Sequence, residues 1–191
     1  MNGIKEIIIV SPNQYKDLAR KLSHEISKVD GCNGAFWSIK QFEDNEFQLG
    51  GNRYAIFIGN SDENSLTHDF LPIITDLKKQ AGASYGFDGS KAVIFGDGKL
   101  EQEKEFKKVL KESVAIAGGT ALATTGAAVG TSLAISSVAF LPIAIPLIPS
   151  VLLGKYILRK KKEKALRTEQ TKVALTLFLA KHFDSWLCLE R

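Results

Sequence analysis

Four short apolar runs in the first hundred residues alternate with segments of helical periodicity. The runs are Ile7–Val10, Ala35–Ile39, Tyr54–Ile58 and Ala92–Phe95. Continuous β-branched and aromatic runs of this length are typical of strands that are covered on both faces. Because strands that alternate with helices favour parallel pairing, the pattern predicts an α/β fold with a small parallel sheet of about four strands, flanked by helices.

The first helix is predicted directly after the first apolar run. Ser11 is expected to cap it, Pro12 suits the first helical position, and Gln14 would complete a capping box. The apolar stripe of this helix consists of Tyr15, Leu18, Ala19, Leu22 and Ile26. The chain therefore opens with a strand, a tight turn and an amphipathic helix, which is half of a βαβ unit.

Later elements are less sharply marked. A helix is expected to start close to Pro72, residues 82–89 are expected to be a loop, and residues 101–112 form a good helix. The tail, residues 168–191, predicts a helix with a broad apolar face. We expect it to pack back on the sheet, and the alternative is that it lies along a membrane with Trp186 at the interface.

One stretch changes this picture, because residues 113–154 contain no charged side chain. A buried core segment is rarely that long, since helices and strands normally keep a polar face. A membrane-crossing helix needs about 20 residues, so residues 113–158 have the length of two crossings. The sequence therefore predicts three parts: an α/β domain over 1–112, an inserted apolar, glycine-rich helical hairpin over 113–158, and a basic segment with an amphipathic helix over 159–191.

Small residues recur along this apolar segment at helical spacing. They are Gly119, Ala123, Gly126 and Gly130. In lipid such a face lets two helix backbones approach closely, which favours self-association, and the alternative is a glycine-rich soluble helix or loop packed on its own domain. In layout, residues 113–158 resemble the hydrophobic helical hairpin of pore-forming bacteriocins and small membrane-disrupting toxins, and that resemblance implies membrane permeabilisation.

Charge is distributed unevenly around the apolar segment. Residues 1–112 carry 15 Lys and Arg against 17 Asp and Glu, whereas residues 113–191 carry 10 against 4. The cations expected at lipid headgroups are Lys155, Arg159, Lys160, Lys161, Lys162 and Lys164. Cations at both ends of the segment, together with the absence of a signal-peptide pattern, predict an inner-membrane protein with both termini cytoplasmic. The alternative to constitutive insertion is a protein that is soluble before insertion. No nucleic acid is expected, because no aromatic residues are interleaved with the basic run.

Polar turn residues follow the predicted strands, where open α/β sheets bind ligands. The candidate ligand-binding residues are Ser11, Asn13, Gly59, Asn60, Ser61, Asp62 and Asp97. Plain strand-to-helix turns use the same residue types. The chain has no G-x-G-x-x-G after its first strand and no P-loop pattern, so no nucleotide cofactor is expected.

Catalytic and metal constellations are not expected. His68 beside Asp69 lacks a third partner, and the carboxylates Glu43, Asp44 and Glu46 are typical of a solvated loop. The two cysteines, Cys32 and Cys188, lie in no metal or redox motif and are expected to be reduced. These features predict neither a catalytic residue nor a metal ligand.

The leading hypothesis is a membrane-associated effector of the toxin or abortive-infection type. In it an α/β sensor or docking domain, triggered by a small molecule or a protein, controls a homo-oligomeric hairpin that permeabilises or depolarises the membrane. The alternative is a membrane-tethered small enzyme that acts on a nucleotide or nucleoside. A third possibility is an assembly scaffold without catalytic activity.

Overall fold

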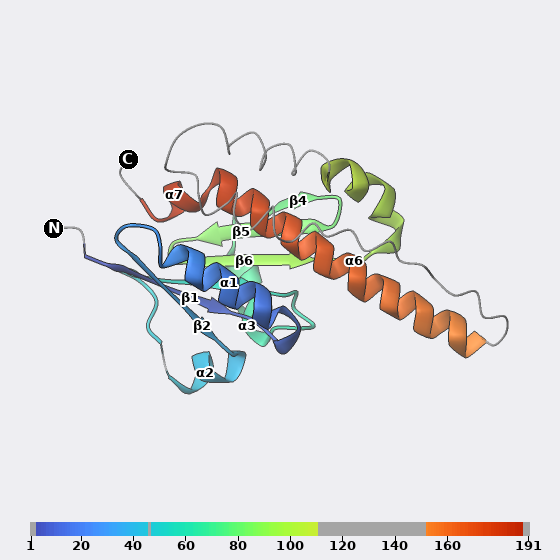
Figure 1. Ribbon diagram of the computed structural model, residues 1–191, viewed down its shortest axis with the longest axis horizontal. Coiled ribbons are helices and arrows are strands. Elements are labelled where there is room, and N and C mark those ends of the chain that lie inside the picture. The colour runs from blue at the N-terminus through green and yellow to red at the C-terminus, as the bar shows by residue number, and fades with distance from the viewer. Residues whose placement is uncertain (1–2, 46, 111–151, 189–191) are drawn as a thin grey trace.

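The protein is built on one mixed β-sheet of six strands in the order β2-β1-β3-β6-β5-β4 (Figure 1). A computed structural model describes residues 3–45, 47–110 and 152–188. The strands are β1 (Lys5–Val10), β2 (Cys32–Trp37), β3 (Arg53–Ile58), β4 (Lys78–Gln80), β5 (Ala83–Asp88) and β6 (Lys91–Gly96). Strands β2, β1, β3 and β6 run parallel, whereas β5 and β4 are antiparallel to their neighbours. The α/β class is confirmed, but the sheet has six strands rather than four.

The four predicted strands are the parallel ones, and the two missed strands form a hairpin at one edge. The expected loop at residues 82–89 is wrong, because most of it is β5. Ala81 and Gly82 join β4 to β5 with φ angles of 50° and 82°, the left-handed conformation that a two-residue hairpin turn requires. Ser84 and Gly86, which read as loop residues in the sequence, lie in β5 and pair with Phe95 and Val93 of β6.

Helices cover both faces of the sheet. The α-helices are α1 (Lys16–Ile26), α2 (Ile39–Asp44), α3 (Ser65–Phe70), α6 (Leu152–Lys181) and α7 (Phe183–Trp186), together with a helix over residues 103–110. The short 3-10 helices are η1 (Asn13–Tyr15), η2 (Leu71–Ile73) and η3 (Leu100–Gln102). α1, α6, α7 and residues 103–110 share one hydrophobic core with the sheet, and α2 and α3 share a second core on the opposite face.

Two predicted helix starts are wrong. No side chain caps the turn after β1: Pro12 is extended, η1 follows it, and the Ser11 hydroxyl has no hydrogen-bond partner among the described residues. The capping box is instead at α2. There the Ser38 hydroxyl accepts from the Gln41 N–H, and the Gln41 side-chain oxygen accepts from the Ser38 N–H. The helix expected near Pro72 lies before it, since α3 ends at Phe70 and the chain turns extended after η2.

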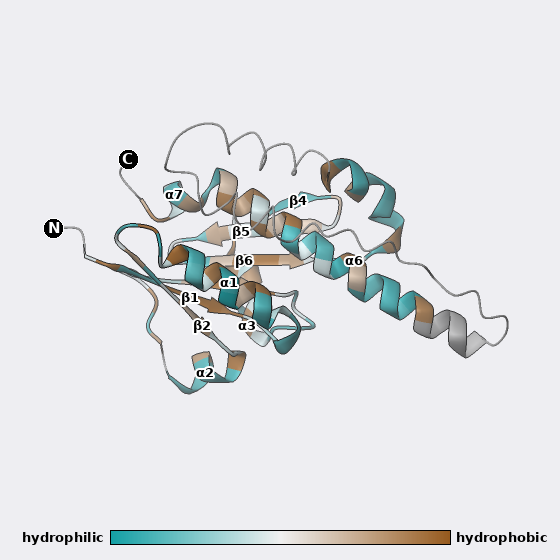
Figure 2. Cartoon of the chain, viewed as in Figure 1, coloured by the Kyte–Doolittle hydropathy of each residue, from teal (hydrophilic) through white to brown (hydrophobic). Residues whose placement is uncertain are grey.

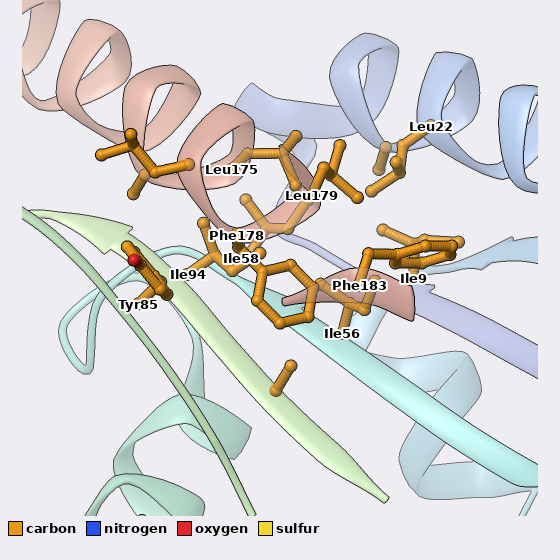
Figure 3. Packing of buried hydrophobic residues seen from close by; sticks show 14 of the residues in the cluster. Ile9, Leu22, Ile56, Ile58, Tyr85, Ile94, Leu175, Phe178, Leu179 and Phe183 are labelled. Atoms are coloured by element: carbon orange, nitrogen blue, oxygen red, sulfur yellow. The ribbon is translucent and has the colours of Figure 1, made fainter. Parts of the chain in front are cut away.

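The C-terminal half of α6 lies in the larger core (Figure 3). Phe178 is fully buried and contacts the rings of Tyr85 and Phe87 on β5. The side chains around it come from α1, α6, α7 and three parallel strands: Ile9, Leu22, Ile56, Ile58, Ile94, Leu175, Leu179 and Phe183. Each such side chain contributes about 1.5–3 kcal/mol when fully buried, so this half of α6 is a structural part of the domain.

The N-terminal half of α6 extends past the carboxyl ends of the parallel strands (Figure 1). Figure 2 shows that its hydrophilic residues gather where it leaves the sheet. α6 is one continuous helix across residue 158. The rest of the predicted hairpin, including Gly119, Ala123, Gly126 and Gly130, lies outside the described residues. Among the helices that are described, none is long and apolar enough to cross a membrane.

Candidate functional site

The loops that carry the predicted ligand residues meet at one edge of the sheet. Strands β1, β3 and β6 are neighbours and parallel, so the turns after Val10, Ile58 and Gly96 all lie at this edge. Gly59 has a φ of 106°, and a Cβ at this position would lie 3.4 Å from Pro12 Cγ. The loops after β1 and β3 are therefore packed against each other.

Glu63, which the sequence analysis did not single out, is the centre of this edge. Its Oε1 accepts a hydrogen bond from Arg167 Nη1 of α6 at 2.9 Å, and its Oε2 accepts one from Tyr15 Oη at 3.2 Å. The Thr171 hydroxyl of α6 lies 3.3 Å from the Tyr15 hydroxyl. Glu63 and Arg167 are 12% and 24% exposed, so α6 is joined to the loop after β3 by a largely buried ion pair.

Tyr15 is a neutral hydrogen-bond donor in this cluster. Burial, opposed by the Thr171 hydrogen bond and reinforced by the neighbouring Glu63 carboxylate, raises the pKa of Tyr15 to about 12. A phenol with such a pKa keeps its proton at neutral pH and donates it to the carboxylate. The arrangement positions α6 and holds no activated nucleophile.

Gln170 makes a second connection between α6 and the sheet. Its Oε1 accepts from the Gly98 N–H at 2.7 Å, and its Nε2 donates to the Ala81 carbonyl at 3.0 Å. A Cβ at Gly96 would lie 2.7 Å from Gln170 Cβ and well inside contact distance of the Arg167 carbonyl oxygen. The helix therefore lies directly on the end of β6, and its side chains occupy the space above that strand end.

The predicted ligand residues have different surroundings. Asn60 Oδ1 accepts from the Asp62 N–H at 3.1 Å, and the Asn60 N–H points to Glu63 Oε2 at 3.4 Å, so these residues shape the turn. Asp97 donates its backbone N–H to the Gly82 carbonyl at 2.9 Å. Asn13, Ser61 and Asp62 are exposed, whereas Ser11 and Gly59 are buried.

The remaining chemical candidates are dispersed. His68 is an exposed residue of α3, and Glu43 accepts a hydrogen bond from the Ser65 hydroxyl at 3.2 Å. Among the described residues, no group of three or more His, Cys, Asp or Glu side chains could hold a metal ion. Glu46, the third predicted carboxylate, lies outside the described part of the chain.

The opposite edge of the sheet carries a shallow depression that the sequence analysis did not anticipate. Its volume is about 480 Å³, and it is lined by Ile4, Glu6, Asn33, Gly50, Asn52 and Arg53. An exposed ion pair between Arg53 Nε and Glu6 Oε2, 3.0 Å apart, crosses it. The residues that line this depression form no sequence pattern that differs from that of ordinary loops.

The basic residues form a surface on the projecting half of α6. Those whose side chains are described are Arg159, Lys160, Lys161, Lys162 and Lys164, and all are exposed. Glu163 pairs with the first two, through contacts of 2.9 Å to Arg159 and 3.7 Å to Lys160. Lys155 lies in the same helix, but its side chain is outside the described set. We call Arg159–Lys164 the basic turns of α6.

A signal for the missed cluster is present in the sequence of α6. Arg167, Gln170 and Thr171 fall at helical spacing on the stripe that continues into Ala174 and Phe178. Polar residues on a stripe that is otherwise apolar need buried partners, which here are Glu63, Gly98 and Tyr15. The stripe predicts that these three side chains have buried partners, but which residues the partners are is known only from the fold.

No protein-family model matches this chain, and neither a curated protein sequence nor a solved structure matches it. The described residues define an α/β protein whose mixed six-stranded sheet is covered on one face by its own C-terminal helix.

Proposed function

We propose that the protein is a membrane-associated effector whose α/β domain controls the apolar segment 113–158. When triggered, this segment would self-associate through Gly119, Ala123, Gly126 and Gly130 and permeabilise or depolarise the inner membrane, with both termini cytoplasmic. The observation that carries the proposal is the continuity of α6. One helix joins the end of the apolar segment at Leu152 to the buried core around Phe178.

The cluster at the strand ends supplies a route for control. Glu63 belongs to the loop after β3. Its ion pair with Arg167 connects this loop to α6, and its hydrogen bond from Tyr15 connects the loop to η1. Tyr15 in turn contacts the Thr171 hydroxyl of α6. A trigger that binds Ser61 or Asp62 and moves this loop would change how α6 is held. Because α6 is a continuous helix, the change would reach its projecting half.

The basic turns of α6 supply the membrane affinity. Lys161, Lys162 and Lys164 are exposed, and the hydrogen bond from Lys107, together with the charge of Lys162, lowers the pKa of Glu103 on the neighbouring helix. Near an anionic surface each cation contributes about 1 kcal/mol of attraction. They follow directly on the apolar segment, so they would hold its end at the headgroup layer.

The test is release of an entrapped dye from vesicles by the purified full chain. Vesicles of zwitterionic lipid alone are compared with vesicles that also contain anionic lipid. We expect release from the anionic vesicles, and we expect the triple variant Lys161→Glu, Lys162→Glu, Lys164→Glu to release at least tenfold less.

The matched control is Lys21→Glu, Lys40→Glu, Lys99→Glu, which makes the same change in net charge at exposed positions elsewhere in the domain. It is expected to release dye like the unmodified protein. Equal release from vesicles with and without anionic lipid, or an equal loss in both triple variants, contradicts the proposal.

A further inference from the structure

The two cysteines of the chain are brought to the same edge of the fold. Cys32 begins β2 and is the register partner of Lys5 on β1, where adjacent parallel strands lie about 4.8 Å apart. Cys188 follows α7, and its carbonyl oxygen lies 3.4 Å from Lys5 Nζ. Lys5 is therefore next to Cys32 on the adjacent strand, and its side chain reaches the backbone of Cys188.

Cys32 and Leu187, the residue before Cys188, pack on the same face of the sheet. Cys32 and Tyr54 both belong to the core beneath α1 and α6, and Lys5 alternates with Ile7 so as to share that face. Lys5 Nζ also donates to the Leu187 carbonyl and lies 6.0 Å from the centre of the Tyr54 ring. Burial, reinforced by the neighbouring Cys188 and Cys32, raises the pKa of Tyr54.

The end of α7 is held over this edge by its own contacts. The Trp186 ring packs edge-on against Tyr54 with 5.1 Å between ring centres, and Trp186 Nε1 donates to the Gly89 carbonyl at 2.9 Å. Cys188, two residues on, has a φ of 48° and is exposed, whereas Cys32 is 8% exposed. One thiol is thus open to small oxidants and the other is screened.

We propose that Cys32 and Cys188 are a thiol modification site that closes to an intramolecular disulfide when the protein meets a low-molecular-weight disulfide such as glutathione disulfide. The bond would fasten the C-terminal end of α7 to β2. It would close a covalent loop over residues 32–188, which includes the whole of α6. The inference is independent of what the apolar segment does.

The exchange occurs in two balanced steps. The exposed Cys188 thiolate attacks one sulfur of the oxidant, which gives a mixed disulfide and releases the first small thiolate, which takes up a proton. The Cys32 thiolate then attacks the Cys188 sulfur, forms the protein disulfide and releases the second small thiol. The protein loses two hydrogen atoms, and one oxidant molecule is reduced to two thiols.

Geometry sets one requirement for the second step. The two Cα atoms of a disulfide lie about 4.4–6.8 Å apart, so the Lys5 side chain has to move from between the two residues. Its four-carbon stem is flexible and its ammonium can remain in water. Cys188 lies at the end of the described chain after α7, where a small backbone movement disturbs no strand pairing.

The experiment treats the purified full chain with glutathione disulfide, followed by unreduced tryptic mass mapping. We expect the intact protein to lose two hydrogen atoms and the peptide of residues 29–40 to appear linked to that of residues 182–191. Both signals should vanish with dithiothreitol. The melting temperature of the linked protein should rise by roughly 5–15 °C.

Two variants complete the design. Cys188→Ser should block the link and leave Cys32 reduced, while Cys32→Ser should accumulate the mixed disulfide at Cys188. The inference is overturned if the unmodified protein also stops at the mixed disulfide with Cys32 reduced, or if the only cross-link joins two copies of the chain.

Discussion

Glu63 and Arg167 lie 104 positions apart in the sequence and form an ion pair of 2.9 Å where β3 ends. Tyr15 donates to the same carboxylate, so three segments of the chain converge on one side chain. Both partners of the pair are largely shielded from water, and the pair therefore differs from the exposed helix pairs elsewhere on the surface. This contact joins the loop after β3 to α6.

Removing either partner of the pair should destabilise the protein. Arg167→Ala leaves the Glu63 carboxylate shielded without its cation, and we expect a loss of about 1–3 kcal/mol in the free energy of unfolding. A double-mutant cycle with Glu63→Ala should give a coupling energy of about 1 kcal/mol or more. Urea unfolding followed by tryptophan fluorescence measures both quantities.

The matched control for this cycle is the exposed pair of Lys107 and Glu103, whose atoms are 2.8 Å apart. Lys107→Ala is expected to change the unfolding free energy by at most about 0.5 kcal/mol. If the two pairs give equal coupling energies, the contact at the end of β3 does not fasten α6.

Alkaline pH should weaken the fold through Tyr15. Its pKa is about 12 in the folded protein and 10.0 for an ordinary tyrosine, so the folded state holds this proton more tightly. The contribution of this proton to the free energy of unfolding is fully present below pH 10 and is lost as the pH rises through about 12. The whole contribution is about 3 kcal/mol. Urea unfolding between about pH 9 and pH 11.5 should show this loss.

Tyr15→Phe isolates that contribution from the other groups that titrate in the same range. The variant loses one hydrogen bond to Glu63 but has no phenol to ionise. Its unfolding free energy should decline less steeply with pH than that of the unmodified protein. Identical slopes for the two proteins would show that Tyr15 titrates normally.

Gly96→Ala should push α6 away from the sheet. The added Cβ would collide with the Arg167 carbonyl oxygen and lie 2.7 Å from Gln170 Cβ, and a backbone atom cannot rotate aside. We expect a loss of about 1–3 kcal/mol, the usual range for overpacking. Gly31→Asn is the control, because Gly31 has a φ of 74°, open space around it, and a conformation that asparagine adopts. Equal stability of Gly96→Ala and the unmodified protein contradicts close packing of α6 on β6.

The sequence predicts the parallel part of the sheet because burial on both faces leaves a visible mark. Ile7–Val10 and Tyr54–Ile58 are continuous apolar runs, and both are strands. β4 leaves no such mark: Lys78–Gln80 is three exposed polar residues that owe their conformation to pairing with β5. An edge strand of this kind is determined by its neighbour, so no pattern within it can reveal it.

The candidate site divides in the same way. That the loops after Val10 and Ile58 share an edge follows from the α/β pattern alone. The pairing of Glu63 with Arg167 does not, because it depends on α6 crossing the end of β6 at one particular height. Arg167 lies three residues after Lys164, the last of the basic turns. Its place on the stripe of α6 indicates that it needs a partner, but the sequence does not say that the partner is Glu63.

Ser27 should protect the free edge of the sheet at β2. Its hydroxyl accepts a hydrogen bond from the Gly34 N–H at 3.0 Å and lies 3.2 Å from the Gly34 carbonyl oxygen. These two backbone groups of β2 point away from the sheet, and β2 is an edge strand that contains no charged residue. Ser27→Ala should lower stability by about 1 kcal/mol and promote self-association through β2, measured by sedimentation velocity. Ser23→Ala is the control, because the Ser23 hydroxyl bonds within α1 to the Arg20 carbonyl. Equal sedimentation of the two variants would remove Ser27 from this role.

Gly126→Leu separates membrane insertion from assembly, the two steps of the proposed function. Leucine adds bulk where two helix backbones would meet, so association through the small-residue face should fail. It also makes the segment more apolar and a better helix former, so insertion should persist or improve. We expect the variant to remain in the membrane fraction, to cross-link only as a monomer and to release no dye from anionic vesicles. A variant that is degraded indicates a soluble glycine-packed core, and one that stays soluble, oligomeric and active excludes pore formation by this segment.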